Sequence, residues 1–319
     1  MRLNLIIQVY CGGVYWQEAW RSVQSCLDCF ENVYVSINYS EIQEQDIAVL
    51  TGADPSKVHW IWHENYMTAK EHGIKIYQWL VSLQLQGHLL LLCHDDLLLR
   101  DGIEELLSLP DNESDAVFGS FVFFDQGSKS RSIGARQFSL ASGEAWSNVT
   151  FARFLFDNRC MISVSGIVLS VAAYTKNMPR IFALKHGCGS EVLLMINPDV
   201  KQIRQSRNPS VKIRLRSGSE GHMAEQFPFR MVYDYLFFCL HSFVLISDPQ
   251  TRISIARTFA VVVREHPWHA LLAVFPAMHS ILKKNRCPLQ IIAIFLYLVQ
   301  ICAVRGYDFL LRKTGLDCR

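Results

Sequence analysis

The chain has 319 residues, enough for one large catalytic domain with an appendage or for two domains. Half of its residues are hydrophobic, and the mean hydropathy of +0.14 is high for an ordinary soluble enzyme. The formal net charge of +2 argues against nucleic acid as a partner, because bulk nucleic-acid binding needs a stronger basic excess. Only Cys26 and Cys29 are spaced CxxC, and no second pair completes a zinc site.

The first residues contain one short apolar run and then continue as a periodic domain, so no cleaved signal peptide is expected. The cysteines otherwise occur singly along the chain. Disulfides are rare in reducing compartments, and a reduced, cytosolic setting is therefore expected.

The first hundred residues alternate apolar runs with segments of helical length. The runs predict strands, and the longer segments between them predict helices. Strands are expected at residues 3–10, 33–37, 58–62 and 89–93, with helices at 15–29 and 67–86. Alternation at this spacing implies right-handed crossovers and a parallel sheet. Neither GxGxxG nor GxxxxGK[ST] occurs in the chain.

The fourth predicted strand ends abruptly in polar residues. His94, Asp95 and Asp96 follow an unbroken run of four leucines. Ligands bind beyond the carboxyl ends of the strands in open α/β sheets. Two carboxylates and an imidazole there indicate a site for a divalent cation. The alternative is a solvated strand-to-helix turn, with Asp101 capping the next helix.

The second part of the chain continues with strands and helices separated by two polar segments. Strands are predicted at residues 116–124 and 161–169, and helices at 147–156 and 188–196. Residues 125–143 and 202–222 predict loops. The second loop carries five basic residues, so it is a candidate for closing over phosphates, with a solvated surface loop as the alternative.

The composition changes from residue 231 onward. Apolar segments of helical length occupy residues 233–246, 269–282 and 289–304, and the last is shorter than the ~20 residues of a transmembrane helix. Lysine and arginine flank that segment on both sides, which favours helices lying in the interface of the cytoplasmic leaflet. The alternatives are a helical bundle packed on the catalytic domain, an oligomer interface, or one marginal spanning helix.

The order of these parts resembles inverting glycosyltransferases of the GT-A fold, family 2-like, and in particular bacterial enzymes that build surface polysaccharides such as O-antigen. The likeness covers about residues 3–222. It is carried by LIIQVYCGGVYWQEAWRSVQSCL, VYVSINYS, HLLLLCHDD and GCGSEVLL. The resemblance implies an α/β, Rossmann-like catalytic domain with a mostly parallel central sheet over residues 1–225. A C-terminal apolar helical, membrane-associating region would occupy residues 226–319.

The resemblance also implies a metal and a catalytic base. Mg²⁺ or Mn²⁺ would neutralise the departing nucleoside diphosphate, held by Asp96, His94 and His222, with His94 standing at the first position of the family's DxD motif. Glu191 resembles the base that deprotonates the acceptor hydroxyl, and Ser190 replaces the first acid of the family's usual pair. Alternatively, Glu191 is simply an acid in a helix's first turn.

By the same resemblance, the nucleotide-sugar donor would contact five residues. Tyr10, Asn38 and Ser40 would line the nucleoside pocket at the ends of the first two strands. Asp95 at the acidic end of the fourth strand and Arg214 in the basic segment complete the predicted donor contacts.

The implied function is that of a hexosyltransferase that moves a sugar from a nucleotide-sugar to a lipid-linked oligosaccharide. It would act at the cytoplasmic face of the bacterial inner membrane, as a peripheral or monotopic protein. One alternative is a non-catalytic membrane-surface scaffold with a degenerate transferase domain, suggested by His94 and Ser190. Another is an HD-type metal phosphohydrolase, which is all-helical and would use His63 and His72 beside His94 and Asp95.

Overall fold

The computed structural model describes residues 1–109, 115–125, 145–157, 164–182, 200–215, 228–265, 270 and 272–273. The chain divides into two compact units, and each is considered by itself. Unit 1 comprises Met1–Asn148, Ile162–Phe182 and Asn197–Ser219, and unit 2 comprises Val149–Met161, Ala183–Ile196 and Glu220–Arg319. The predicted domain boundary near residue 225 stays a prediction.

Unit 1 is built on one mixed sheet. Its strands are β1 (Leu3–Val9), β2 (Val33–Ile37), β3 (Val58–Trp62), β4 (His88–Cys93), β5 (Leu97–Leu98), β6 (Asp115–Asp125), β7 (Trp146–Ser147), β8 (Ile167–Ser170) and β9 (Gln202–Leu215). Its helices are α1 (Gly13–Gln24), α2 (Gln43–Ala48), α3 (Ala69–Ser82), α4 (Arg100–Ser108) and α6 (Val171–Ile181), with a 3-10 turn at Leu27–Cys29.

The parallel half of the sheet confirms the predicted α/β architecture. In the described chain the strand order is β3-β2-β1-β4-β8-β6-β9-β5, with β7 paired to β9. The first four of these strands run parallel, so their carboxyl ends meet at one edge. β1, β2 and β4 are almost wholly buried, which explains their continuous apolar sequences. Unlike that half, β8 pairs antiparallel with both β4 and β6.

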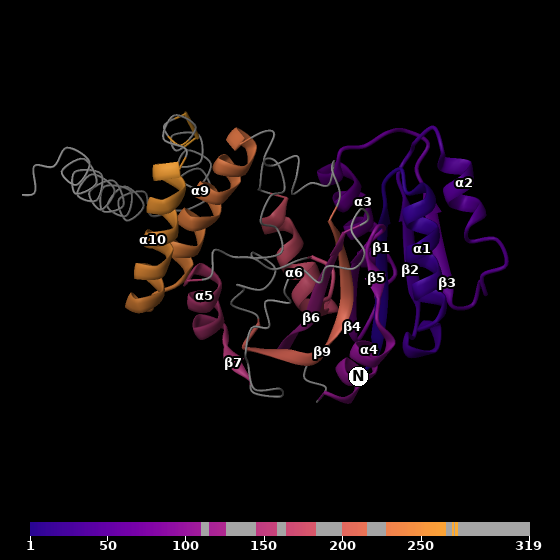
Figure 1. The fold of residues 1–319 in the computed structure, drawn as a ribbon, viewed down its shortest axis with the longest axis horizontal. Helices are drawn as coiled ribbons and strands as arrows, with labels where there is room; N and C mark the ends of the chain where they lie inside the picture. Colours follow the sequence, from indigo (N-terminus) through magenta and orange to yellow (C-terminus); the bar gives the residue numbers. More distant parts are fainter. Residues whose placement is uncertain are drawn as a thin grey trace, which may run out of the picture. The chain divides into compact units, whose positions relative to one another are not determined.

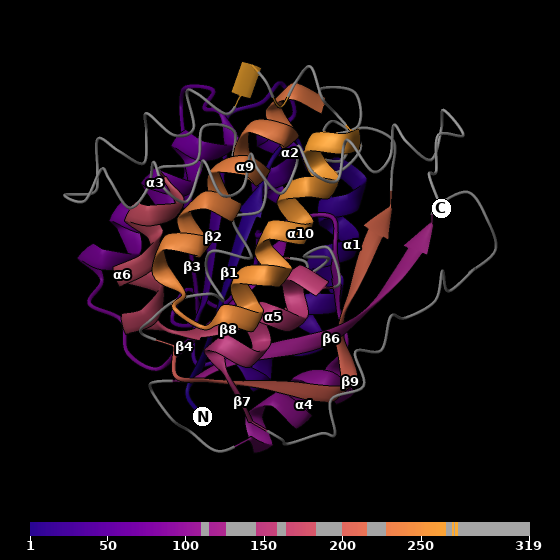
Figure 2. The ribbon, with the colours of Figure 1, turned by 90° about the vertical axis from the view of Figure 1, so that its left-hand side faces the viewer.

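Helices cover both faces of this sheet. α1 contacts α2 on one face, and α3 contacts α6 on the other. Figure 2 shows α3 and α6 on one side of strands β1 to β3 and α1 on the opposite side. The arrangement follows from right-handed crossovers, because the chain reverses direction across the sheet between β3 and β4. Some predicted elements differ in extent: α1 ends at Gln24, α3 ends at Ser82, and β8 starts only after a turn at Gly166, whose φ is +91°.

The turn from β1 into α1 is fixed by a carboxylate from α2. Asp46 is fully buried, and its two oxygens accept the backbone N–H groups of Gly12 and Gly13 at 3.0 and 2.8 Å. N–H groups at a helix start have no intrahelical partner, and negative charge is favourable there. The Asp46 carbonyl also accepts the indole N–H of Trp16 at 3.0 Å, so α2 is tied to α1.

The structure corrects the prediction of a loop over residues 202–222. Residues 202–215 form β9, which pairs along β6 over its whole length. Ile203, Val211 and Ile213 are buried beside the less buried Arg204 and Lys212, as on a strand with one covered face, although Ser210 and Arg214 are buried as well. Pro209 interrupts the strand pattern in the sequence. It lies where the pairing register between β6 and β9 shifts, a position at which a strand tolerates proline. The predicted loop at 125–143, apart from Asp125 at the end of β6, and the predicted helix at 188–196 lie outside the described residues.

Unit 2 is helical where it is described, with α5 (Asn148–Asp157), α9 (Pro228–Leu245) and α10 (Pro249–Glu265), which Figure 1 shows beside one another. Phe156 of α5 stacks on Phe238 of α9 at 5.2 Å, and its carbonyl accepts the hydroxyl of Thr258 of α10 at 2.9 Å. No described helix has both the length and the apolar character needed to cross a membrane. The predicted segment at 289–304 and most of that at 269–282 lie outside the described residues.

Replacement of Asp46 tests the clasp between α1 and α2. Asp46→Ala should lower the free energy of unfolding by about 2–4 kcal/mol, because two buried N–H groups lose their acceptor. Urea denaturation of the two proteins measures this difference. Asp54→Ala is the control, since the Asp54 carboxylate is exposed and binds only Ser56. An equal loss in both variants would contradict the role of Asp46.

Candidate active site

The acidic pair lies in a tight turn at the carboxyl edge of the sheet. β4 ends at Cys93, and the N–H of Asp96 donates to the Cys93 carbonyl at 3.2 Å. His94, Asp95 and Asp96 are all buried, with exposures of 7, 9 and 4%. The alternative of a solvated turn is therefore wrong. Since β4 is parallel to β1, this turn shares its edge with the residues that follow β1.

Asp96 is held from two distant parts of the chain. Its carboxylate accepts the Ser165 hydroxyl at 2.5 Å and the backbone N–H of Arg214 at 2.8 Å. The Ser165 oxygen in turn accepts the N–H of Cys93 at 3.0 Å. Burial and then the neighbouring charge of Asp95 raise the pKa of Asp96 to about 7, and the two hydrogen bonds only partly offset them. The ionised carboxylate is thus destabilised unless positive charge is added beside it.

Arg214 is packed against the acidic turn and is itself neutralised. Its side chain is 2% exposed and pairs with Glu18 of α1 at 2.5 Å, while its Nε donates to the Asp95 carbonyl at 2.8 Å. The guanidinium lies over the rings of Tyr15 and Phe124, at 4.8 and 4.5 Å from their centroids. Arg214 was predicted to lie in a loop that closes over phosphates. In the structure it lies in strand β9, and its hydrogen bonds join that strand to the acidic turn.

The acidic pair suits a divalent cation that completes its shell with ligand oxygens. Within the described ranges, no group of three His, Cys, Asp or Glu residues is arranged to hold a metal ion. Asp95 and Asp96 are two adjacent carboxylates, and Mg²⁺ usually takes only one or two carboxylates together with substrate phosphates. The raised pKa of Asp96 favours such a cation, because added positive charge stabilises the ionised form.

Two histidines share one serine hydroxyl behind this edge. Ser36 of β2 contacts Nε2 of His63 at 3.0 Å and Nε2 of His72 at 2.8 Å. The ring of Tyr10 meets that of His72 edge to face at 4.9 Å. Burial, with smaller contributions from His63 and His94, lowers the pKa of His72 to about 3, so this ring is neutral at physiological pH. These contacts join the ends of β1 and β2 to α3 and to the residue that follows β3.

Asn38 and Ser40 lie at the end of β2, as predicted, but Asn38 is occupied by the backbone. Its amide donates to the Met67 carbonyl at 2.7 Å, and its carbonyl accepts the N–H groups of Met67 and Tyr39 at 3.1 and 2.9 Å. Asn38 therefore clasps the segment that follows β3. Ser40 is 8% exposed, and its hydroxyl has no hydrogen-bond partner within the described chain.

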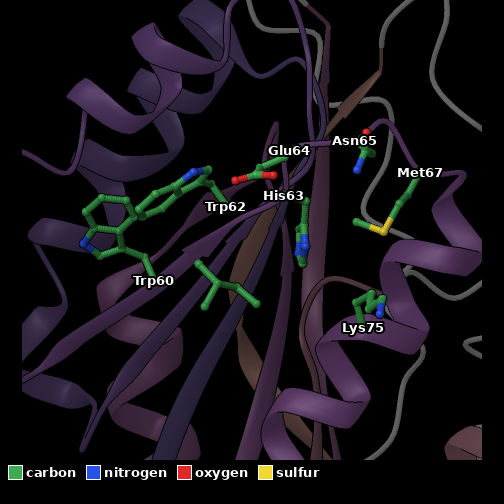
Figure 3. A pocket seen from close by; sticks show the side chains of 8 residues that line it. Trp60, Trp62, His63, Glu64, Asn65, Met67 and Lys75 are labelled. Carbon is green, nitrogen blue, oxygen red and sulfur yellow. The ribbon is translucent and has the colours of Figure 1, made fainter.

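An open pocket lies beside this clasp at the edge strand β3. Its cavity volume is about 620 Å³, and Figure 3 shows side chains from β3, from the segment after it and from α3 around it. The lining residues are Trp60, Ile61, Trp62, His63, Glu64, Asn65, Met67 and Lys75. The pocket is thus separated from the acidic turn by β2 and β1.

The predicted site residues fall into two groups. The structure places Tyr10, Asn38 and Ser40 at the ends of β1 and β2. It brings His94, Asp95, Asp96 and Arg214 together at the end of β4. Glu191, Ser190 and His222 lie outside the described residues, so their predicted roles stay predictions.

Sequence reasoning missed three residues that shape the site. Glu18 and Ser165 contact it from segments far from the acidic pair in sequence, and no motif marks either of them. His72 was considered only for a phosphohydrolase, whose all-helical fold the mixed sheet excludes. Its single sequence signal is its place in the first turn of α3, directly after the capping box formed by Thr68 and Glu71.

The sequence matches no protein-family model and no curated protein. The structure, however, is similar to solved GT-A-type glycosyltransferases. Residues 1–349 of S. aureus TarS superpose with a TM-score of 0.56 at 13% identity, covering 83% of this chain and 72% of that one. The same fragment solved in complex with UDP gives a TM-score of 0.57. A longer TarS structure gives 0.60 at 11% identity, covering 96% of this chain and 54% of that one.

A second solved protein supports the same fold. The mannosyltransferase PcManGT from Pyrobaculum calidifontis, solved with GDP-Man and Mn²⁺, gives a TM-score of 0.52 at 11% identity. The alignment covers 97% of this chain and 82% of that one. The chain therefore has the GT-A fold, with its acidic pair at the carboxyl edge of the parallel strands.

The cost of burying Asp96 can be measured as stability. A carboxyl whose pKa is raised on folding lowers stability when ionised. That cost is absent below about pH 4, grows as the pH rises and is complete above about pH 7. Without divalent metal, Asp96→Asn should therefore exceed the wild-type free energy of unfolding by roughly 2–4 kcal/mol at pH 8. The difference should shrink steadily towards pH 5, as urea titrations at several pH values would show.

Asp101→Asn is the matched control. Asp101 is exposed in the first turn of α4, so removing its charge relieves no desolvation. A wild-type protein that is more stable than Asp96→Asn at pH 8 would show that the buried carboxylate is compensated by charge already present.

Proposed function

We propose that the chain is a glycosyltransferase that moves a sugar from a nucleotide-sugar donor to a saccharide acceptor, with inversion and with help from a divalent metal. The observation that carries this proposal is the buried pair Asp95–Asp96 at the carboxyl edge of a GT-A sheet. Carboxyl groups whose pKa is raised by burial and by a neighbouring like charge are enriched at functional sites, and Asp96 is such a group.

The residues divide the work of donor binding. Asp95 and Asp96 would hold Mg²⁺ or Mn²⁺, with His94 beside them, and the cation would neutralise charge that develops on the departing diphosphate. Arg214 fixes the turn through the backbone carbonyl of Asp95 and the carboxylate of Asp96, so the Asp96 carboxylate is preorganised. Tyr10 and Ser40 lie at the neighbouring strand ends, where a nucleoside would reach.

The acceptor side of the reaction rests on sequence alone. Inversion at the anomeric carbon requires a base for the acceptor hydroxyl, and we propose Glu191 for that role. His222 is proposed as a further contact to metal or diphosphate. We also propose that the acceptor is lipid-linked, as in the assembly of bacterial surface polysaccharides such as O-antigen. The basic, apolar C-terminal region would then keep the protein on the cytoplasmic face of the inner membrane.

Nucleotide release tests the proposed reaction. The purified chain is incubated with UDP-, GDP- and dTDP-sugars, with and without Mn²⁺ or Mg²⁺, and free nucleoside diphosphate is measured. We expect metal-dependent release from one donor. Asp96→Asn should reduce release at least ~10²-fold, because the cation loses a charged ligand. Asp101→Asn, which alters an exposed carboxylate, should leave release unchanged.

Calorimetric measurement of donor binding distinguishes a transferase that releases nucleotide only with its acceptor from a non-catalytic scaffold. Metal-dependent binding of one nucleotide-sugar, lost in Asp96→Asn, would sustain the proposal even if release needs the acceptor. If no donor binds in the presence of metal, the chain is not a transferase and the scaffold interpretation takes its place.

Vesicle flotation tests the membrane association of the full chain. We expect binding to vesicles that contain anionic phosphatidylglycerol and weaker binding to neutral phosphatidylcholine, because the lysines and arginines beside residues 289–304 are attracted by anionic lipid. Binding should fall as salt is raised, since salt screens exposed charges. Equal recovery with neutral and anionic vesicles, or with neither, would contradict the electrostatic association.

A further inference from the structure

Exposed aromatic side chains gather at one corner of unit 1. Among the described residues, the large aromatic side chains classed as exposed are Tyr39, Trp62 and Tyr66, with exposures of 42, 52 and 68%. All three belong to β3 or to the segments that follow β2 and β3, whose register pairs Ile37 with Trp62. Of the three, Trp62 lines the pocket on β3, and a large exposed aromatic side chain in a pocket is typical of a binding site.

The corner is a rigid platform. Trp60 and Trp62 lie two residues apart on the edge strand, with ring centroids 5.2 Å apart and planes tilted by 37°. The N–H of His63 donates to the Ile37 carbonyl at 3.0 Å, and the His63 carbonyl accepts the Gln43 side chain at 2.9 Å. Together with the clasp on Met67, these bonds hold the indole pair and its neighbours before any ligand arrives, which lowers the entropic cost of binding.

The lining of the pocket has the chemistry that a saccharide requires. A pyranose ring offers an apolar C–H face to an indole and a rim of hydroxyls to polar groups. Glu64 supplies an acceptor beside the Trp62 indole, while Asn65 and Lys75 supply an amide and a donor from the part of the pocket beyond His63, as Figure 3 shows. The tilt between the indoles suits successive sugar rings that are turned against one another better than one flat nucleobase. The volume of about 620 Å³ leaves room for more than one ring.

The distance from the acidic pair selects the acceptor rather than the reacting sugar. β3 is three strand intervals from β4, which corresponds to about 14 Å at ~4.8 Å per interval. A sugar on the indole pair is therefore too far from the acidic turn to react. A chain whose end lies at the turn would reach the indoles with units a short distance behind that end.

We propose that the pocket on β3 is a saccharide-binding site, in which Trp60 and Trp62 hold neutral sugar units of the acceptor glycan away from the reacting end. The identification of this saccharide as the acceptor rests on the proposed transferase function, whereas saccharide binding itself does not.

Glycan binding by the full chain, measured without donor or metal, tests the proposal. The protein is applied to an array of immobilised neutral oligosaccharides, and the best ligand is titrated in solution by calorimetry. Trp62→Ala should weaken binding at least tenfold, because the stacked face is lost. Val81→Ala is the matched control, since Val81 is 44% exposed on α3 and lies outside the pocket. Affinity for UDP or GDP, titrated in parallel with Mn²⁺, should be the same in all three proteins.

Three results would overturn the proposal. The first is that the wild-type chain binds no glycan, and the second is that Trp62→Ala binds glycan as tightly as the wild type. The third is that Trp62→Ala loses affinity for the nucleotide, which would assign the pocket to the base of the donor. Glu64→Gln, which keeps the indoles, provides a second variant if Trp62→Ala does not fold, and it should also weaken glycan binding. If glycan binds but no nucleotide is released, the proposed function fails while the saccharide site stands.

Discussion

The site depends on one buried carboxylate. Asp96 follows the leucine-rich strand β4, which ends at Cys93, and it is bound by the Ser165 hydroxyl and by the backbone N–H of Arg214, so two remote segments converge on it. These two bonds do not offset the loss of water and the charge of Asp95, which is why the Asp96 pKa stands near 7. The fold therefore keeps a group that favours a nearby cation, and the proposed role of the metal rests on this property.

The cationic side chain of Arg214 stabilises the structure of the acidic turn. Its guanidinium contacts two aromatic rings and pairs with Glu18. Its charge is therefore already compensated, and the side chain joins β9 to the acidic turn. Glu18 pairs with this guanidinium, whereas Asp95 binds it through a backbone carbonyl and Asp96 binds the backbone N–H of Arg214. The balance of charge at the turn thus favours a further cation rather than a second anion.

The parallel order of strands places two different surfaces on one edge. The acidic turn follows β4, the clasp of Asn38 follows β2, and the indole pair of Trp60 and Trp62 lies on β3. Because parallel strands all end at the same edge, residues separated by many positions in sequence share one working face. The proposed donor and saccharide sites are neighbours for that reason.

The sequence by itself determined the parallel half of the fold and the place of the acidic pair. The strand β2 is buried throughout, and β3 at the sheet edge is rich in Val, Ile and Trp, so both runs are readable to the residue, and the polar stop after the four leucines marks a strand end. Only the tertiary structure decided what surrounds that end. Ser165 and Glu18 reach Asp96 and Arg214 through long-range packing, which leaves no local signal, and β9 was hidden because Pro209 interrupts its alternation at a shift in register. Local periodicity reports which face of an element is buried, whereas its partner across the sheet is set by how the whole chain packs.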